Sequence, residues 1–202
     1  MNVSDKVICL DFPCVDINRQ TYTVSSVNID SQKVRIFMVS EVPPPDNNDY
    51  FYSGDKSFYL QTTLQAFNDA GVPVSGMREI LDKGIYITTA VKCGKTDYSL
   101  STETVRNCSV LLEKEMALFP NIKVFLLMGD VAIRSMNYIW KKQTGNLVIP
   151  AGSTYKLRKQ HYYFEGKRVF PSYLQTGKNY LIEKSKRKMI AEDIRAAIDL
   201  IK

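Results

Sequence analysis

Four cysteines are the residues of this chain whose type and spacing point most directly to chemistry. Cys9 and Cys14 lie close together near the N-terminus, and Cys93 and Cys108 bracket a loop and the start of an expected helix. Disulfides are not expected in an intracellular chain, because its thiols are kept reduced. Metal or cluster ligation is therefore the leading hypothesis.

Glu41 is a second candidate because of where it stands in the chain. It directly follows residues 33–40 (KVRIFMVS), an apolar run with β-branched residues that is typical of a buried strand. Three prolines at 43–45 then prevent a ladder or a helix interior from continuing. Open α/β sheets bind ligands in loops at the carboxyl ends of core strands. We therefore expect a binding site beside Glu41.

A basic segment is the third feature. Residues 154–190 hold ten lysines and arginines against two glutamates, a local excess larger than the +6 of the whole chain. Such a run is often only a solvated face of the protein. It is also the charge pattern of a surface that binds nucleic-acid phosphates. Charge alone does not decide between the two interpretations.

The length and composition fit one ordinary domain. The chain has 202 residues, of which 45% are hydrophobic and 24% charged, so it can bury a core without help. The N-terminus carries Asp5 and Lys6 and leads into no long apolar run, and no stretch of about 18 apolar residues could span a bilayer. We expect a single domain over 1–202, a cytoplasmic location and no membrane contact, and nothing in the sequence indicates oligomerisation.

The chemistry-bearing residues are positioned by alternating strands and helices. Strands are predicted at 33–40, 84–93 and 123–128, with a more polar β region at 154–173. Helices are predicted from 58 to 70, from Ser101 to about 119, from 130 to about 142 and at the C-terminus. This alternation predicts an α/β fold, a three-layer α/β/α domain around a mainly parallel four-stranded sheet.

Several short motifs match those of one known family in order and spacing. Residues 38–44 (MVSEVPP) look like its Gly-Glu-Ala-Pro-Gly motif, and residues 87–93 (ITTAVKC) look like its strand ending in Asn-x-x-Lys-Cys. Residues 106–108, 125–132 and 169–173 are similar to its Cys-x-x-x-Leu, Leu-Gly-x-x-Ala and His-Pro-Ser segments. Over nearly its whole length the chain resembles the uracil-DNA glycosylase superfamily, and within it the four-cysteine, iron–sulfur branch.

The resemblance implies a DNA glycosylase, which flips a uracil or another deaminated or modified base out of DNA and hydrolyses its N-glycosidic bond. It implies a [4Fe–4S] cluster on the four cysteines, although the spacing of Cys9 and Cys14 is wider than in the family. Zinc ligation and free core cysteines stay open as alternatives. It places Glu41 in a water-activating loop, with Asp49 as a second acidic residue and Asp46 nearby. The residues expected to form the base pocket are Val42, Pro43, Phe58 or Tyr59, and Thr89.

Two pocket residues depart from the family pattern. Thr89 stands where the family has a uracil-reading asparagine, and a single hydroxyl cannot present the donor and acceptor of an amide together. Phe170, or Leu174 in another alignment, stands near the place of the catalytic histidine, and His161 is interpreted as structural. Uracil specificity is therefore not implied.

The basic segment gains a function from the resemblance, because the loop 172–178 is where the family inserts an apolar residue into the duplex. Leu174 is the expected wedge, and flanking cations would hold phosphates. The residues expected to contact DNA are Ser172, Leu174, Lys178, Lys184, Lys186 and Arg187.

Two other functions remain open. One is a non-catalytic relative that binds nucleic acid and carries the cluster as a structural element, which the missing histidine and asparagine favour. The other is a nucleotide-pocket enzyme, such as a free-nucleoside hydrolase, which would not need the basic segment.

Overall fold

The computed structural model describes residues 1–202, apart from the side chain of Asn179. Its strands are β1 (Ile17–Asn18), β2 (Ile36–Ser40), β3 (Ile85–Thr89), β4 (Gly94–Lys95), β5 (Val124–Met128), β6 (Tyr162–Phe164) and β7 (Lys167–Ser172). Its helices are α1 (Phe58–Asp69), α2 (Met77–Asp82), α3 (Thr102–Met116), α4 (Asp130–Thr144), α5 (Thr154–Leu157), α6 (Lys178–Ile182) and α7 (Lys184–Asp199). Short 3-10 turns lie at Arg19–Thr21 and Asn47–Asp49.

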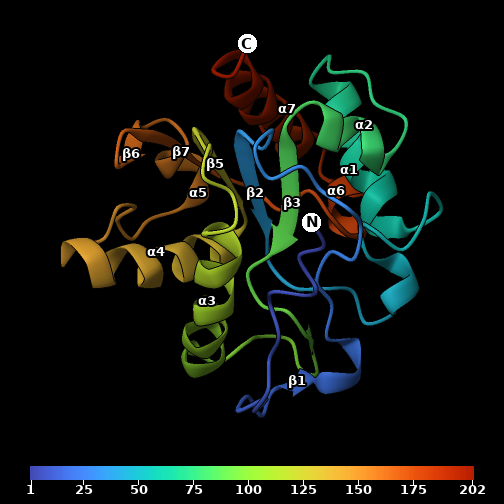
Figure 1. Cartoon of the computed structure of the whole chain (residues 1–202). Coiled ribbons are helices and arrows are strands. Elements are labelled where there is room, and N and C mark those ends of the chain that lie inside the picture. The colour runs from blue at the N-terminus through green and yellow to red at the C-terminus, as the bar shows by residue number, and fades with distance from the viewer.

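Five strands form the central sheet in the order β3-β2-β5-β7-β6. The first four run parallel, and β6 pairs antiparallel with β7. Figure 1 shows α3 and α4 on one side of the sheet and α1, α2 and α7 on the other. The expected α/β fold with a mainly parallel sheet between helical layers is confirmed.

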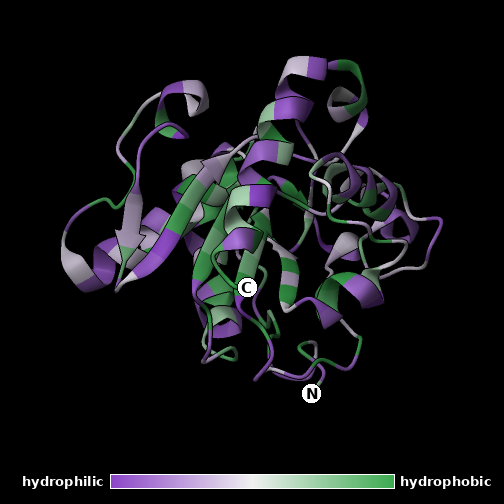
Figure 2. Ribbon diagram, turned by 90° about the horizontal axis from the view of Figure 1, so that it is seen from above, coloured by the Kyte–Doolittle hydropathy of each residue, from purple (hydrophilic) through white to green (hydrophobic). Residues whose placement is uncertain are grey.

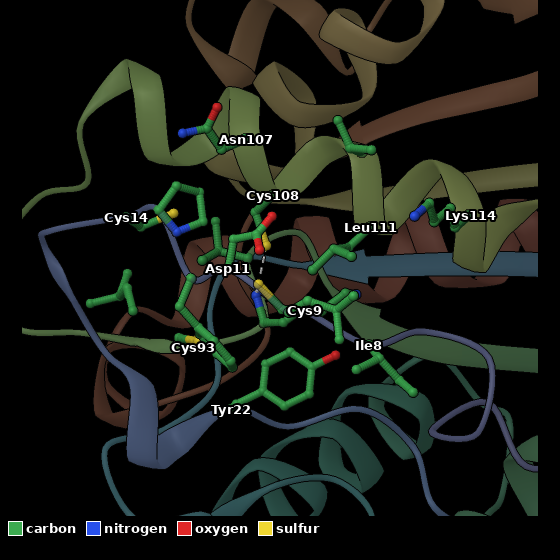
Figure 3. A pocket seen from close by; sticks show the side chains of 17 residues that line it. Ile8, Cys9, Asp11, Cys14, Tyr22, Cys93, Asn107, Cys108, Leu111 and Lys114 are labelled. Carbon is green, nitrogen blue, oxygen red and sulfur yellow. Dashed lines mark hydrogen bonds between the residues drawn. The ribbon is translucent and has the colours of Figure 1, made fainter.

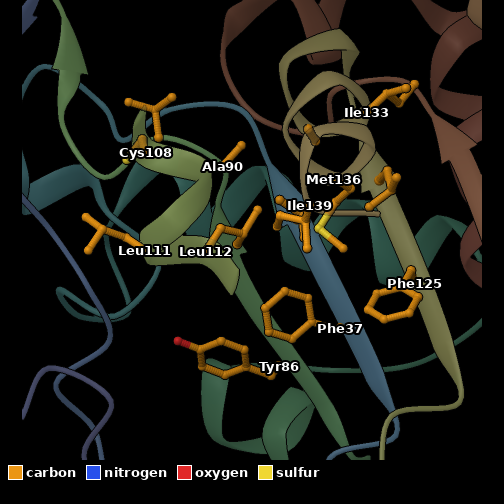
Figure 4. Packing of buried hydrophobic residues seen from close by; sticks show 14 of the residues in the cluster. Phe37, Tyr86, Ala90, Cys108, Leu111, Leu112, Phe125, Ile133, Met136 and Ile139 are labelled. Carbon is orange, nitrogen blue, oxygen red and sulfur yellow. The ribbon is translucent and has the colours of Figure 1, made fainter. Parts of the chain in front are cut away.

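The central strands are buried on both faces, as parallel strands covered by helices must be. Phe37 and Val39 of β2 belong to the core cluster under α3 and α4, whereas Ile36 and Met38 belong to the cluster under α1 and α7. Figure 4 shows the first cluster, with Phe37 and Phe125 between the sheet and the helices. In Figure 2 the strands are mostly hydrophobic and the exposed helix faces hydrophilic.

The sheet has five strands rather than the four expected. Residues 154–173, interpreted as one β region, contain α5 and then the hairpin of β6 and β7. Glu165 (φ 48°) and Gly166 (φ 76°) both have positive φ, which is the geometry of a two-residue turn that matches the twist of a hairpin. A glutamate is an uncommon residue at the first of these positions, so the hairpin was missed.

The predicted long helices are confirmed, with small changes at their ends. Ser101 caps α3, because its Oγ accepts a hydrogen bond from the Thr104 N–H at 3.1 Å. The last helix buries Ile190, Ile194 and Ile198 as expected. The short helices α2, α5 and α6 were not predicted. None of the helices within residues 1–202 is long and apolar enough to cross a membrane.

The N-terminal segment crosses the sheet at the carboxyl ends of its parallel strands. β1 pairs antiparallel with β4, and the Thr23 N–H donates to the Lys92 carbonyl at 2.8 Å. In Figure 1 this segment, with β1, lies below the arrowhead of β3. The arrangement brings the N-terminal cysteines to the loop that follows β3.

Candidate active site and cysteine site

Two hollows lie at the carboxyl ends of the parallel strands. The cysteine hollow, of about 300 Å³, is lined by all four cysteines together with residues such as Ile17, Tyr22 and Leu111. The Glu41 cavity, of about 440 Å³, is lined by Glu41 and by residues from the loops after β3, β5 and β7. The sequence motifs therefore meet at one end of the molecule.

The four cysteines converge from three parts of the chain. Cys9 and Cys14 come from the N-terminal segment, Cys93 from the loop after β3 and Cys108 from α3. Figure 3 shows their side chains around one space, beside the ring of Tyr22. All four are free thiols, and Cys93 and Cys108 are buried. The structure thus brings together the residues predicted as ligands.

The thiols of the buried pair are protonated at neutral pH. Burial, with a smaller contribution from the neighbouring cysteines, raises the pKa of Cys93 to about 12 and that of Cys108 to about 11. The Lys92 backbone N–H donates to the Cys108 Sγ at 3.2 Å, which acts in the opposite direction. Any metal that binds here must displace these protons.

The four thiols do not form a site for a single ion as they stand. Within the described residues, no group of three or more His, Cys, Asp or Glu side chains is arranged to hold one metal ion. A zinc ion needs four ligands around one point, at about 2.3 Å for sulfur. In a [4Fe–4S] cluster each thiolate binds a different iron, so the four sulfurs stand farther apart.

The Glu41 carboxylate is anchored at the N-terminus of α4. Its Oε1 accepts a hydrogen bond from the Val131 N–H at 3.1 Å, where the helix dipole favours negative charge. Burial raises the pKa of Glu41, and the nearby Asp130 raises it further, while the Val131 N–H and Lys95 lower it. A half-buried carboxylate with a raised pKa is suited to accept a proton.

Gly129 makes this position of Glu41 possible. Its φ is 106°, and a Cβ at this residue would lie 2.5 Å from the Glu41 Oε1. Only a residue without a side chain allows the carboxylate to lie against the turn between β5 and α4. The Gly-Asp pair at 129–130 is thus part of the site and not merely a helix start.

The Glu41 cavity gathers several of the predicted pocket and DNA-binding residues. Besides Glu41, the predicted residues in its lining are Val42, Tyr59, Leu174, Lys178 and Lys186. Tyr59 extends from α1, and its pKa is raised by burial and lowered by a hydrogen bond with Thr176. The loops after β2 and β7 therefore meet over this cavity, as the resemblance implies.

Other predicted pocket residues lie outside the lining of the cavity. Pro43 is buried, and Phe58 is half-buried at the start of α1. The Asp49 Oδ1 accepts a hydrogen bond from the Phe58 N–H at 3.2 Å, so this carboxylate caps α1. Thr89 is fully buried at the end of β3, and its Oγ1 has no hydrogen-bond partner among the described groups.

Two residues predicted to contact DNA bind other residues of the protein instead. Ser172 is fully buried, and its Oγ donates to Asp193 of α7 at 2.6 Å, so it offers no surface to a phosphate. Arg187 pairs with Asp69 of α1 at 2.7 Å. Lys184, by contrast, is exposed. The motif serine therefore fixes the loop rather than the DNA.

The histidine position of the motif faces the core. Phe170 packs in the cluster under α1 and α7, and the Arg168 guanidinium lies 4.2 Å from the centre of its ring. His161 lines a separate hollow with Lys123 and Arg168, at the amino ends of the strands. The one histidine of the chain is thus at the wrong end of the sheet to act with Glu41.

The structure adds residues to the site that sequence patterns did not reveal. Lys95, Tyr173 and Tyr180 also line the Glu41 cavity, and Leu181 and Ile182 on the neighbouring α6 are exposed, Ile182 by 73%. Lys95, Tyr173 and Tyr180 carry no sequence signal for this position, because they reach the cavity from segments that are far apart in the chain.

A buried ion pair lies beside the cysteine hollow, which Lys92 helps to line. Lys92 and Glu115 are both fully buried, and the Lys92 ammonium contacts the Glu115 carboxylate and the Thr89 carbonyl. Tyr86 donates to the Glu115 Oε1 at 2.5 Å, and Thr88 donates to it at 2.9 Å. The pair joins α3 to the end of β3, the strand that leads to Cys93.

The comparisons with known proteins agree with this geometry. A family model described as the uracil DNA glycosylase superfamily matches residues 28–196. The chain is also similar to the type-5 uracil-DNA glycosylase of Thermus thermophilus, with 30% identity over 53 residues. That alignment covers 26% of this chain and only 24% of the relative, so the similarity spans about a quarter of either protein.

Proposed function

This chain belongs to the uracil DNA glycosylase superfamily, and we propose that it is a DNA glycosylase that excises uracil or another deaminated or modified base by hydrolysis. The observation that carries the proposal is the Glu41 carboxylate, anchored on α4 and facing a cavity with lysines at its rim. The cavity of about 440 Å³ suits one flipped nucleotide.

The reaction needs a general base and a water molecule. When the glycosidic bond breaks, positive charge develops on the sugar and negative charge on the departing base. Glu41 as a carboxylate would take a proton from water as the water oxygen attacks the sugar carbon. Its raised pKa makes it a stronger base than an exposed glutamate.

Base recognition in this protein would depend on tyrosines and hydroxyls. Tyr59 and Tyr173 line the cavity and offer aromatic rings and hydroxyl groups to a base. A hydroxyl can donate or accept, so it accommodates bases with different edges. We therefore propose that the excised base is not restricted to uracil.

DNA would be held by the segment that follows β7. Lys178 and Lys184 are exposed there, and Lys186 lines the cavity. Leu174 lies in the cavity wall as the proposed wedge, and the exposed pair Leu181 and Ile182 extends the apolar surface beside it. Lysines around an apolar edge would grip phosphates while the edge enters the stack.

A nicking assay tests the proposed activity. Labelled duplexes and single strands that carry one uracil, hypoxanthine, xanthine or 5-hydroxymethyluracil are incubated with the protein and then treated with alkali. We expect cleavage at the modified position for at least one base, and loss of this cleavage in Glu41→Gln. No cleavage of any substrate by protein with intact fold would refute the proposed activity.

A second candidate function is a non-catalytic protein that binds nucleic acid. It is favoured by the position of His161, which lies at the other end of the sheet from Glu41. This candidate predicts salt-sensitive DNA binding without cleavage in the same assay, and equal behaviour of Glu41→Gln and the wild-type protein.

We further propose a [4Fe–4S] cluster in the cysteine hollow, held by Cys9, Cys14, Cys93 and Cys108. Four thiols from three parts of the chain that line one largely apolar hollow support this ligand set. The cluster would tie the N-terminal segment to α3 and could transfer electrons. Anaerobically purified protein should be brown, with absorbance near about 400 nm and about four irons per chain, as such clusters show. Colourless protein with zinc would contradict the proposal.

A further inference from the structure

Lys95 is a cavity residue to which no role has been given above. It belongs to β4, two residues after Cys93, and lines the cavity together with Glu41 and Tyr59. It is exposed, so its ammonium group can reach a ligand in the cavity. Its effect on the pKa of Glu41 shows that the two charges lie close enough to interact.

The backbone around Lys95 is held firmly. Lys95 pairs with Ile17 in the small antiparallel sheet, and the Gly94 N–H donates to the Thr21 Oγ1 at 2.7 Å. A Cβ on Gly94 would lie 2.9 Å from the Thr21 Oγ1 and 3.3 Å from the Pro44 carbonyl oxygen. The strand therefore packs directly against the loop that carries Glu41, which fixes the distance between the two segments.

The charge of Lys95 is available to a ligand, unlike that of Lys186. Its Nζ donates to the Tyr98 carbonyl at 2.5 Å, and it makes no ion pair with any described carboxylate. Lys186, which also lines the cavity, pairs with Glu183 at 2.6 Å. Lys95 lowers the pKa of Glu41, as expected of a cation that shares the cavity with it. Lys95 is thus a positive charge in the cavity without an ionic partner among the described residues.

We propose that Lys95 is a further catalytic residue, whose ammonium group stabilises the negative charge on the departing base. The inference rests on the proposed glycosylase function. The carboxylate of Glu41 repels an anion that forms in the same cavity, so the site needs a cation to offset this repulsion. Lys95 is placed to do so, because it shares the cavity with Glu41.

The step balances without any other reactant. The bond between C1′ and the base nitrogen breaks, and its electron pair stays on the base. The oxygen of water bonds to C1′, and the proton that it loses passes to Glu41. Lys95 keeps its proton and donates a charge-assisted hydrogen bond to a carbonyl oxygen of the base anion. The base later takes a proton from the solvent.

A leaving-group comparison tests this role. Single-turnover cleavage is measured for duplexes with uracil and with 5-fluorouracil, whose anion is more stable and departs more readily. We expect Lys95→Met to lose roughly 100-fold or more in rate on uracil and less than about tenfold on 5-fluorouracil. Lys95→Arg, which keeps the charge, should restore most of the rate. Circular dichroism checks that the variants are folded.

Two control variants separate this role from a phosphate contact. Lys178→Met removes another lysine of the cavity rim, and it should weaken DNA binding equally for both bases. Lys83→Met lies at the end of α2, in a hollow away from the cavity, and should leave both rates unchanged. Binding of DNA by Lys95→Met should keep the affinity and salt dependence of the wild-type protein.

The outcomes distinguish the two proposals. Three results for Lys95→Met would overturn the role of Lys95: an equal loss of rate on both bases, unchanged rates, or a weaker DNA affinity with a smaller salt dependence. In each case, cleavage by the wild-type protein would still support the glycosylase. Cleavage of another modified base in the nicking assay but of neither uracil nor 5-fluorouracil would overturn the role of Lys95 alone. If the wild-type protein cleaves no modified base at all, the glycosylase proposal fails, and the role of Lys95 fails with it.

Discussion

Glu41 shows how the chemistry of one residue depends on its immediate surroundings. The carboxylate is drawn to the N-terminus of α4 by the Val131 N–H, and it lies against Gly129 because that residue lacks a side chain. Burial opposes its ionisation, and this raises its pKa. The same environment that makes Glu41 a better base therefore makes it sensitive to pH.

The pH dependence of cleavage follows from this raised pKa. As the pH falls, Glu41 should become protonated at a higher pH than a glutamate with the ordinary value of 4.5. Water activation needs the carboxylate, so kcat/KM should decrease on the acidic side at a pH clearly above 4.5. A profile of single-turnover rates from pH 4 to 9 checks this, and Glu41→Gln should lose about 100-fold or more in rate.

The raised pKa of Glu41 also predicts that its charge lowers the stability of the fold. A carboxyl group whose pKa is raised in the fold costs stability where it is charged, and this cost grows as the pH rises through the ordinary range. Glu41→Gln should therefore gain stability relative to the wild-type protein between about pH 4 and pH 7. Urea unfolding at both pH values measures the gain, and an equal difference at both would show that Glu41 is not buried as described.

Gly129 allows a matched test of the site. Gly129→Ala and Gly166→Ala each place an alanine at positive φ, so both should lose about 1–3 kcal/mol of stability. Only at Gly129 would the new Cβ collide with Glu41, since nothing lies within 4 Å at Gly166. We expect Gly129→Ala alone to lose cleavage activity. Equal cleavage activity of the two variants would show that catalysis does not depend on the position of Glu41.

The Lys92–Glu115 pair predicts a large stability effect. Lys92→Met leaves a carboxylate buried without its cation, which should cost about 3–5 kcal/mol in the free energy of unfolding. Arg78→Met removes the exposed partner of Asp82 and should cost less than about 1 kcal/mol. The double variant Lys92→Met/Glu115→Gln should recover much of the loss. If Lys92→Met lost no more stability than Arg78→Met, burial of the charge would be contradicted.

At the scale of elements, α6 and α7 divide the basic segment into two kinds of residue. Arg158 of the turn after α5 pairs with Asp193 of α7 at 2.7 Å, and Asp193 also accepts from Ser172. These contacts fix the loop after β7. The exposed Lys178 and Lys184 have no such internal partner among the described residues. Only cations of the second kind are free to bind DNA.

The salt dependence of DNA binding should reveal this division. Lys178→Met and Lys184→Met should each reduce the slope of log K against log salt by about 1, because each phosphate contact releases counterions. Arg187→Met removes a cation already paired with Asp69 and should change the slope less. Fluorescence anisotropy over a salt series measures these slopes. Equal slopes for all three variants would place the DNA elsewhere.

At the scale of the whole molecule, the N-terminal segment links the two hollows. It supplies Cys9 and Cys14 to one hollow, and through β1 it holds Lys95 at the other. The loop after β3 connects Cys93 to Lys95 directly. A short, hydrogen-bonded segment therefore connects the two hollows.

Removal of the proposed cluster should loosen this segment first. Oxidation with ferricyanide and a chelator should lower Tm and speed proteolytic cleavage within the first 16 residues, because binding of a metal group stabilises the fold that holds it. Untreated Cys93→Ser, which lacks one proposed ligand, should be as sensitive to proteolysis as the treated wild-type protein. Limited proteolysis with mass spectrometry identifies the cut sites. An unchanged cleavage pattern would mean that the cysteines do not hold the segment.

The sequence by itself determined the α/β fold, the long helices and the strands of the parallel core. These follow from hydrophobic periodicity and capping, which are local properties. The order of the motifs likewise placed Glu41 and Cys93 after core strands. The single domain, the cytoplasmic location and the ligands of the cysteines stay predictions.

Only the tertiary structure decided which polar residues share a cavity. Lys95, Tyr173 and Tyr180 join Glu41 from loops that are far apart in sequence, while Thr89 and Ser172 turn away into buried positions. A strand-end residue faces the site or the core according to the pairing register and the loops packed over it. That choice depends on long-range contacts, which no local pattern encodes. The four cysteines converge for the same reason, because the N-terminal segment crosses the sheet to reach the loop after β3.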